Sequence, residues 1–289
     1  MSNMVINTNV LALNSHRAMK NVGQAQSTAS ARLSSGLRIN SAADDAAGLA
    51  ISEKMRAQVR GLDQASRNAQ DGSSMVQTAE GGMQQITNML QRGRELTVQA
   101  ANHTNTGDDR MKIANEINQL FQEIDSMAER VEFNGMKLIN GDFKAANAIH
   151  LQVGANKNQS IQFSIGSLKV SDLKLADVHS TVKLSTGANS FHSMTGSAIN
   201  NLLSDFDVAI NSVVDERAQL GAVQNRLDYT MRSLDISSEN LSASESRIRD
   251  TDMAREMMNL TKSNVLSSAA TSMLAQANQA PQNLLQILR

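Results

Sequence analysis

Residues 62–100 read LDQASRNAQDGSSMVQTAEGGMQQITNMLQRGRELTVQA, and this stretch decides the fold. Small or apolar residues recur in it at alternating steps of three and four: Leu62, Ala65, Ala69, Gly72, Val76, Ala79, Met83, Ile86, Leu90, Gly93, Thr97 and Ala100. A second row recurs every seven residues: Phe206, Val213, Leu220, Leu227, Leu234, Leu241 and Ile248. Heptads of this length predict long helices that pack along their whole length. The expected fold class is mainly α, a long antiparallel coiled coil or helical bundle.

The composition favours slim helices over a wide globular core. The 289 residues include six Phe, one Tyr and no Trp, and Pro281 is the single proline. Helices can therefore run uninterrupted almost everywhere. The lack of cysteine excludes disulfides and Cys-ligated metals. No apolar run approaches the roughly 18 residues of a membrane span. The first residues also lack the pattern of a secretory signal, which taken alone predicts a cytoplasmic protein.

Capping signals divide the first half of the chain into helices. A first helix is expected over about residues 5–35, before a break at a Ser-Ser-Gly sequence. Ser41 and Asp44 have the spacing of a capping box, and Asp44 and Asp45 are expected in the first turn of the next helix. That helix should continue for roughly 60 residues. Residues 106–109 should end it and cap a third helix.

The middle of the chain changes character. Asn134-Gly135 and Asn140-Gly141 are strong turn signals. Apolar residues alternate at period two on either side of residues 154–158, which predicts a small β-hairpin region. The stretch 167–193 is rich in Ser, Thr and Lys and has no clear period. Helix should return near residue 195 and run antiparallel into the mid-250s, which brings both termini to the same end of the bundle.

Both ends of the chain are nearly free of charge. Residues 1–43 contain four basic and no acidic residues, and residues 257–289 contain only Lys262 and Arg289 as charged residues. Floppy tails are one reading of this composition. Apolar stripes at helical spacing favour the other reading, in which the ends are covered by another copy of the chain. The residues expected at that polymer interface are Leu11, Ala18, Val22, Ala25, Leu33, Leu266, Ala270, Met273, Ala277, Leu284, Ile287 and Leu288.

No pattern in the sequence indicates catalysis or a bound cofactor. None of the five histidines begins a metal-ligand spacing, and no phosphate-binding glycine motif occurs. Gly81-Gly82 lies inside a predicted helix and indicates close packing. The basic residues are scattered with almost no aromatics between them, which disfavours nucleic-acid binding. We therefore expect that the chain is not an enzyme and binds no metal and no cofactor.

Several blocks carry a resemblance to a known family. The sequence LSSGLRINSAADDAAGLAIS, residues 33–52, strongly resembles the N-terminal signature of bacterial flagellins. Residues 5–9, 91–96, 133–135, 240–250 and 275–289 fit the same family, in the expected order. The resemblance covers roughly residues 1–140 and 195–289. Residues 143–193 stand where many flagellins carry large outer domains, so the chain resembles a short form.

The resemblance implies a structural subunit that is exported unfolded, without a cleaved signal peptide, and polymerises into the extracellular flagellar filament for motility. It implies inner-tube helices at 1–43 and 256–289, a helical shell at 44–142 and 194–255, and a short β and loop region at 143–193. The interface residues named above would then line the inner coiled coil. An export chaperone, the filament cap and hook-junction proteins are the implied partners.

The resemblance also implies that Arg92, Leu96 and Glu116 contact an innate immune receptor of animals, with ordinary subunit contacts as the alternative. Two other functions compete with the filament. A hook-filament junction protein has similar ends but should depart from the blocks at 43–52 and 279–289. The signalling rod of a chemoreceptor is also a long heptad hairpin, but it offers no use for a β insertion or for charge-free termini.

Limited proteolysis of the unassembled chain should trim roughly the first 40 and the last 35 residues. Ala-rich seams bury so little area, at about 25 cal/mol per Å², that an isolated end helix barely offsets its ordering entropy. Fragment masses from a protease time course should show an intact core over about residues 44–250. Equal protection of the ends and the core in dilute solution would contradict this expectation.

Overall fold

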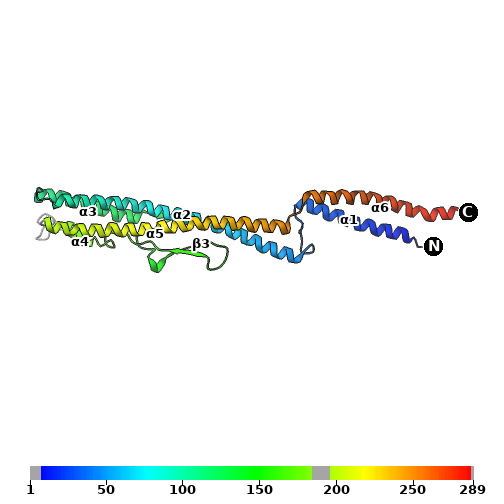
Figure 1. Cartoon of the computed structure of the whole chain (residues 1–289), viewed down its shortest axis with the longest axis horizontal. Helices are drawn as coiled ribbons and strands as arrows, with labels where there is room; N and C mark the ends of the chain where they lie inside the picture. Colours follow the sequence, from blue (N-terminus) through cyan, green and yellow to red (C-terminus); the bar gives the residue numbers. More distant parts are fainter. Residues whose placement is uncertain (1–7, 184–195, 288–289) are drawn as a thin grey trace. The chain divides into compact units, whose positions relative to one another are not determined.

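The computed structural model describes residues 8–183 and 196–287 and is mainly α-helical, which confirms the predicted fold class (Figure 1). The chain divides into two compact units. The terminal unit contains residues 1–59 and 239–289, and the central unit contains residues 60–238. Two helices contribute to both units: α2 (Ala46–Ala101) and α5 (Gly196–Arg249). These boundaries follow contacts within the chain and cut through helices, whereas the segments predicted from the sequence were defined by role.

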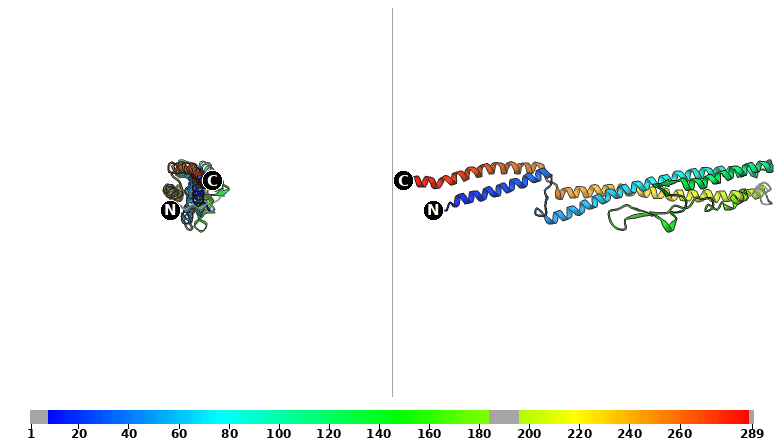
Figure 2. Two further views of the ribbon diagram at one scale, coloured as in Figure 1. Left: turned by 90° about the vertical axis from the view of Figure 1, so that its right-hand side faces the viewer. Right: turned by 180° about the vertical axis from the view of Figure 1, so that it is seen from behind.

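In the terminal unit, α1 (Val10–Ser35) packs against α6 (Met253–Ile287) in the antiparallel direction (Figures 1 and 2). The amide of Asn9 donates to the carbonyl of Ala277 at 2.6 Å, and the amide of Gln26 donates to Asn264 at 2.9 Å. The start of α1 therefore lies beside the C-terminal part of α6, which agrees with the prediction that both termini lie at the same end (Figure 1). Few side chains are fully buried along this pair, so the expectation of ends that open readily stands.

Local signals end and start these helices. Gly36 ends α1 in the left-handed conformation, with φ of 72°, and its N–H donates to the carbonyl of Arg32 at 2.8 Å. The expectation that Asp44 and Asp45 lie in the first turn of α2 is wrong, because both precede the helix. Asp45 is its cap and accepts from the N–H of Gly48 at 2.9 Å. Asp44 instead holds the preceding loop.

The central unit packs α2 and α5 with α3 (Gly107–Arg130) around one apolar core. The predicted cap at Thr106 is confirmed, since Thr106 and Asp109 form a capping box. Phe121 and Phe206 stack with ring centroids 5.8 Å apart, which joins α3 to α5. The ring of Phe206 packs directly on the backbone of α2 at Gly93. A Cβ at Gly93 would lie only 2.7 Å from the ring. This close approach explains a glycine inside a helix.

The β region lies in the central unit and contains more strands than the sequence indicates. The predicted hairpin is confirmed as β3 (Ile149–Gln152) paired with β4 (Ser160–Phe163). The turn predicted at Asn134-Gly135 joins two further strands, β1 (Glu132–Phe133) and β2 (Met136–Lys137), which were not expected. A short helix, α4 (Ala176–Lys183), also forms where no period was found. It is held by Val178 and Val182, which reach the core at helical spacing.

Gly93→Ala should lower the free energy of unfolding by about 1–2 kcal/mol, because the clash with the buried Phe206 outweighs the gain in helix propensity. Gly81→Ala is the matched control on the same helix, where an added Cβ meets nothing within 4 Å. It should stabilise the chain by up to about 1 kcal/mol. Urea unfolding followed by circular dichroism measures both. Stabilisation of equal size by the two substitutions would show that the ring yields freely.

Candidate assembly surface

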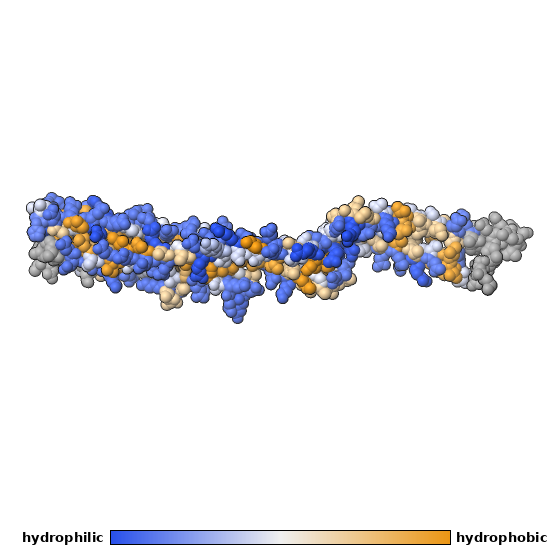
Figure 3. Space-filling model, in the orientation of Figure 1, coloured by the Kyte–Doolittle hydropathy of each residue, from blue (hydrophilic) through white to orange (hydrophobic). Residues whose placement is uncertain are grey.

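Helix α6 carries different residues on its two faces. The face toward α1 carries small or polar residues at heptad spacing, including the buried Glu256, Ser263 and Ala277. The other face is more exposed, and of its residues Leu266 also lines the groove toward α1. Its large apolar residues are Met258 (66% exposed), Val265 (65%), Leu266 (44%) and Met273 (56%). We call these four residues the outer face of α6, and Figure 3 shows apolar surface along this helix. A helix that is apolar all round is normally buried.

Helix α1 also leaves apolar residues uncovered. Val10, Leu11 and Leu13, in its first turns, are all more than half exposed. Only Ala29 on α1 is fully buried among the described residues of that helix. The first turns of α1 and the outer face of α6 therefore expose apolar area in the same unit.

The structure divides the twelve predicted interface residues into three groups. Exposed positions are Leu11, Ala18, Ala25, Leu266 and Met273. Positions covered partly or fully within the chain are Val22, Leu33, Ala270 and Ala277. The side chains of Leu284, Ile287 and Leu288 lie outside the described residues. Two exposed positions, Met258 and Val265, were missed, although their spacing of seven residues is a signal that the sequence contains.

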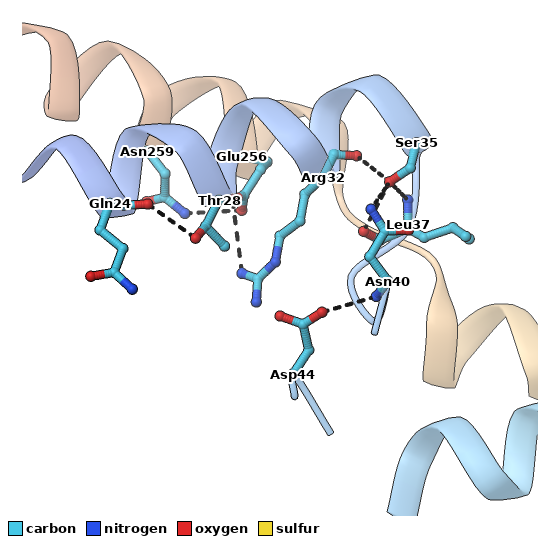
Figure 4. Close-up of polar contacts among 9 residues, drawn as sticks. All are labelled: Gln24, Thr28, Arg32, Ser35, Leu37, Asn40, Asp44, Glu256 and Asn259. Carbon is cyan, nitrogen blue, oxygen red and sulfur yellow. Dashed lines mark hydrogen bonds and ion pairs between the residues drawn. The ribbon is translucent and has the colours of Figure 1, made fainter. Parts of the chain in front are cut away.

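A groove of about 530 Å³ runs between α1 and α6 and is lined by both helices. Arg32 points across it to Glu256, with 3.9 Å between the charged groups (Figure 4). Glu256 is buried and also accepts from the amide of Asn259 at 3.2 Å. The Nε of Arg32 is buried without a hydrogen-bond partner. These polar contacts orient the two helices relative to each other. The large apolar residues of the pair take no part in them.

Backbone hydrogen bonds and an ion pair inside the terminal unit fix the junction where α1 ends and α6 begins. The N–H of Thr251 donates to the carbonyl of Gly36 at 3.0 Å, and the N–H of Arg38 donates to the carbonyl of Arg249 at 2.6 Å. The guanidinium of Arg249, itself buried, lies 2.5 Å from the carboxylate of Glu53. These contacts were not predictable from local sequence, because they join residues about 200 positions apart.

Asp44 stabilises the loop between α1 and α2. Its carboxylate accepts from the backbone N–H of Ser41 at 2.9 Å, from the Ser41 hydroxyl at 3.0 Å and from the N–H of Asn40 at 3.2 Å (Figure 4 draws the last). These hydrogen bonds, those from Ser41 first, lower the pKa of Asp44 below its ordinary value. The charged form of Asp44 is therefore the form that holds the loop.

The three residues expected at an immune-receptor contact do not share one surface. Arg92 and Glu116 are exposed and form an ion pair of 2.9 Å between α2 and α3. That hydrogen bond and the charge of Glu116 raise the pKa of Arg92. Leu96 is 2% exposed and packs in the core of the central unit. In this conformation its side chain supports the helix and is not presented to a partner.

The described residues contain no cluster of His, Cys, Asp or Glu that could hold a metal ion. Within the same residues, no helix combines the length and apolar character needed to cross a bilayer. What the fold does present is a pair of helices with uncovered apolar area. On this geometry the described part of the chain is a helical protein whose terminal helix pair exposes apolar side chains.

Comparisons with known proteins specify the family. The model of the bacterial flagellin N-terminal helical region matches residues 6–144, and that of the C-terminal helical region matches residues 203–288. The flagellin of Halalkalibacterium halodurans is 48% identical over 287 residues, which cover 99% of this chain and 100% of the relative. The flagellin of Bacillus subtilis is 48% identical over 305 residues with the same coverage. The chain belongs to the bacterial flagellin family.

A solved structure shows the same fold at greater distance. The putative flagellar hook-associated protein of Vibrio parahaemolyticus superposes with a TM-score of 0.59 at 12% identity, over 72% of this chain and 100% of that one. At this identity the likeness concerns the fold alone. The identity to flagellins, in contrast, extends over nearly the whole chain and separates the filament protein from the hook-junction alternative.

The carboxyl of Asp44 should titrate below the ordinary value of about 3.9 for Asp. Because its pKa is lowered in the folded chain, its stabilisation of the loop is present above the unfolded value and is lost as pH falls through the lowered pKa. An NMR titration of the Asp44 carboxyl carbon and of the Ser41 amide measures this. In Asp44→Asn the Ser41 amide should no longer respond in this range. A midpoint at or above the value in an unfolded peptide would contradict the role of these hydrogen bonds.

Proposed function

We propose that this flagellin, a structural subunit of the extracellular bacterial flagellar filament, polymerises by covering the outer face of α6 and the first turns of α1 with the same helices of neighbouring copies. The observation that carries the proposal is the outer face itself, four large apolar and exposed residues in a helix that packs on α1 through its small and polar residues. A monomer has no use for this exposed apolar face.

The energetics favour association through this surface. Full burial of a Val or Leu side chain contributes about 1.5–3 kcal/mol. Each copy offers the outer face of α6 and the start of α1, which are different surfaces. Contacts between unlike surfaces are heterologous and extend into an open helical array when the rotation does not close a ring. The same contact then recurs at every subunit, so a small gain per residue supports a long polymer.

The roles predicted for the segments enter this proposal unchanged. Residues 1–43 and 256–289 form the inner coiled coil of the tube, and residues 44–142 and 194–255 form the helical shell. The short region 143–193 lies outside the shell. Two kinds of observation support the assignment. Most of the large buried side chains lie in the central unit, and the terminal unit holds the exposed apolar side chains of α1 and α6.

We further propose that the chain acts without catalysis and is exported unfolded through the flagellar secretion apparatus, without a cleaved signal peptide. Its additional partners are an export chaperone on the C-terminal segment, the filament cap and the hook-junction proteins. An animal innate immune receptor would contact the exposed pair Arg92 and Glu116. The ion pair between these residues gives that surface a fixed geometry.

Val265→Asp together with Leu266→Asp should abolish seeded polymerisation at concentrations where the native chain assembles. Two charges in a closed apolar contact cost several kcal/mol, and each 1.4 kcal/mol raises the critical concentration about tenfold. Sedimentation of seeded reactions measures the critical concentration. Thermal melting of the unassembled chain should change little, since both side chains are exposed there.

Val265→Thr is the matched control, because it keeps the shape of the side chain and adds no charge. It should raise the critical concentration by much less than the double Asp variant. Filaments of the double variant at the native concentration would rule out the outer face of α6 as the interface. A large loss of monomer stability would show that these side chains serve the fold.

A further inference from the structure

Exposed methionine is concentrated on one helix of the chain. Among the described side chains, the strongly exposed methionines are Met136 on β2 and four on α6: Met253, Met257, Met258 and Met273. Met75 and Met83, in contrast, are buried in the core of the central unit, at 3% and 0% exposure. Among the described residues, the most exposed thioethers are therefore gathered on the helix that carries the outer face.

We propose that α6 is an oxidation-sensitive assembly element, in which peroxide converts these four methionines to sulfoxides and thereby blocks polymerisation of free subunits. The proposal rests on the outer face of α6 being the polymer contact. It adds a modification site and a consequence that the polymer contact alone does not require.

The chemistry needs only a peroxide as co-reactant. The thioether sulfur gives an electron pair to one peroxide oxygen, an S–O bond forms and the O–O bond breaks. The second oxygen leaves as water after taking up a proton, so the sulfur is oxidised and the peroxide is reduced. The product is a polar sulfoxide in place of a flexible apolar side chain.

The position of each methionine determines whether its oxidation affects assembly. Met258 and Met273 belong to the outer face itself, and Met253 and Met257 lie in the first turns of the same helix, beside it. A sulfoxide oxygen at Met258 or Met273 must enter the contact that these residues form together with Val265 and Leu266. Burying an unpaired polar group there is unfavourable. Sulfoxide at Met136 lies on β2 in the central unit, outside this contact.

The test treats unassembled chain with hydrogen peroxide and removes the peroxide before seeding. Peptide mass spectrometry should find sulfoxide at the α6 methionines well before it appears at Met75 and Met83. The critical concentration should rise at least about tenfold relative to untreated chain. Treatment of the oxidised chain with both methionine sulfoxide reductases should restore the untreated value.

Variants locate the effect. In a chain with Met253→Leu, Met257→Leu, Met258→Leu and Met273→Leu, the ratio of critical concentrations after and before peroxide should fall to near one. Each variant is compared with itself, so any effect of Leu on assembly cancels in the ratio. Met136→Leu is the control at an exposed methionine outside α6 and should keep the full response of the native chain.

Three results would overturn the proposal: oxidised native chain that assembles as well as untreated chain, an unchanged ratio in the fourfold Leu variant, or no recovery with the reductases. The outcome is separable from that of the proposed function. If Val265→Asp with Leu266→Asp blocks assembly while oxidation does not, the interface stands and the oxidation site alone fails. If the double Asp variant assembles normally, the interface itself fails.

Discussion

The central unit depends on the contact between Phe206 and the bare backbone at Gly93. The ring of Phe206 lies where a Cβ on α2 would be, and its other side stacks on Phe121 of α3. Phe121 in turn meets His179 of α4 edge-on, with centroids 5.7 Å apart. Four helices therefore share one small aromatic cluster. The chain has few aromatic residues. The glycine at this point lets two of their rings pack closely between the helices without leaving a void.

The terminal unit lacks such a cluster and is organised by polar contacts instead. Arg32 with Glu256, Asn9 with Ala277 and the backbone bonds at the junction set the direction and register of α1 and α6. Polar contacts of this kind fix geometry and contribute modestly to net stability. The apolar area that would stabilise the unit is turned outward. One chain thus combines a central unit with a buried apolar core and a terminal helix pair that leaves large apolar side chains exposed.

The heptad rows predicted the long helices well, because a period sustained over many turns leaves one arrangement that buries it. They could not show which surface covers a given row. Ala79 and Met83 are buried in the central unit, whereas Leu266 and Met273 are exposed on α6, although both pairs belong to similar rows of small and apolar residues in the sequence. Leu96, which the family resemblance placed at a receptor contact, lies in the core. Strands of two residues and the eight-residue α4 are too short for a period to reveal. The Arg249–Glu53 pair is a long-range contact without any local signal.

The pairing of α1 with α6 also sets an order of events during synthesis. Asn9 and the residue that accepts its hydrogen bond, Ala277, are separated by 268 positions. Ribosomes add about 5–20 residues per second, so α1 leaves the ribosome on the order of 15–50 s before its partner exists. The central unit has all of its helices earlier and can condense first. The first helix to be made is therefore among the last to be paired. During that interval its apolar residues are accessible to other proteins in the cell.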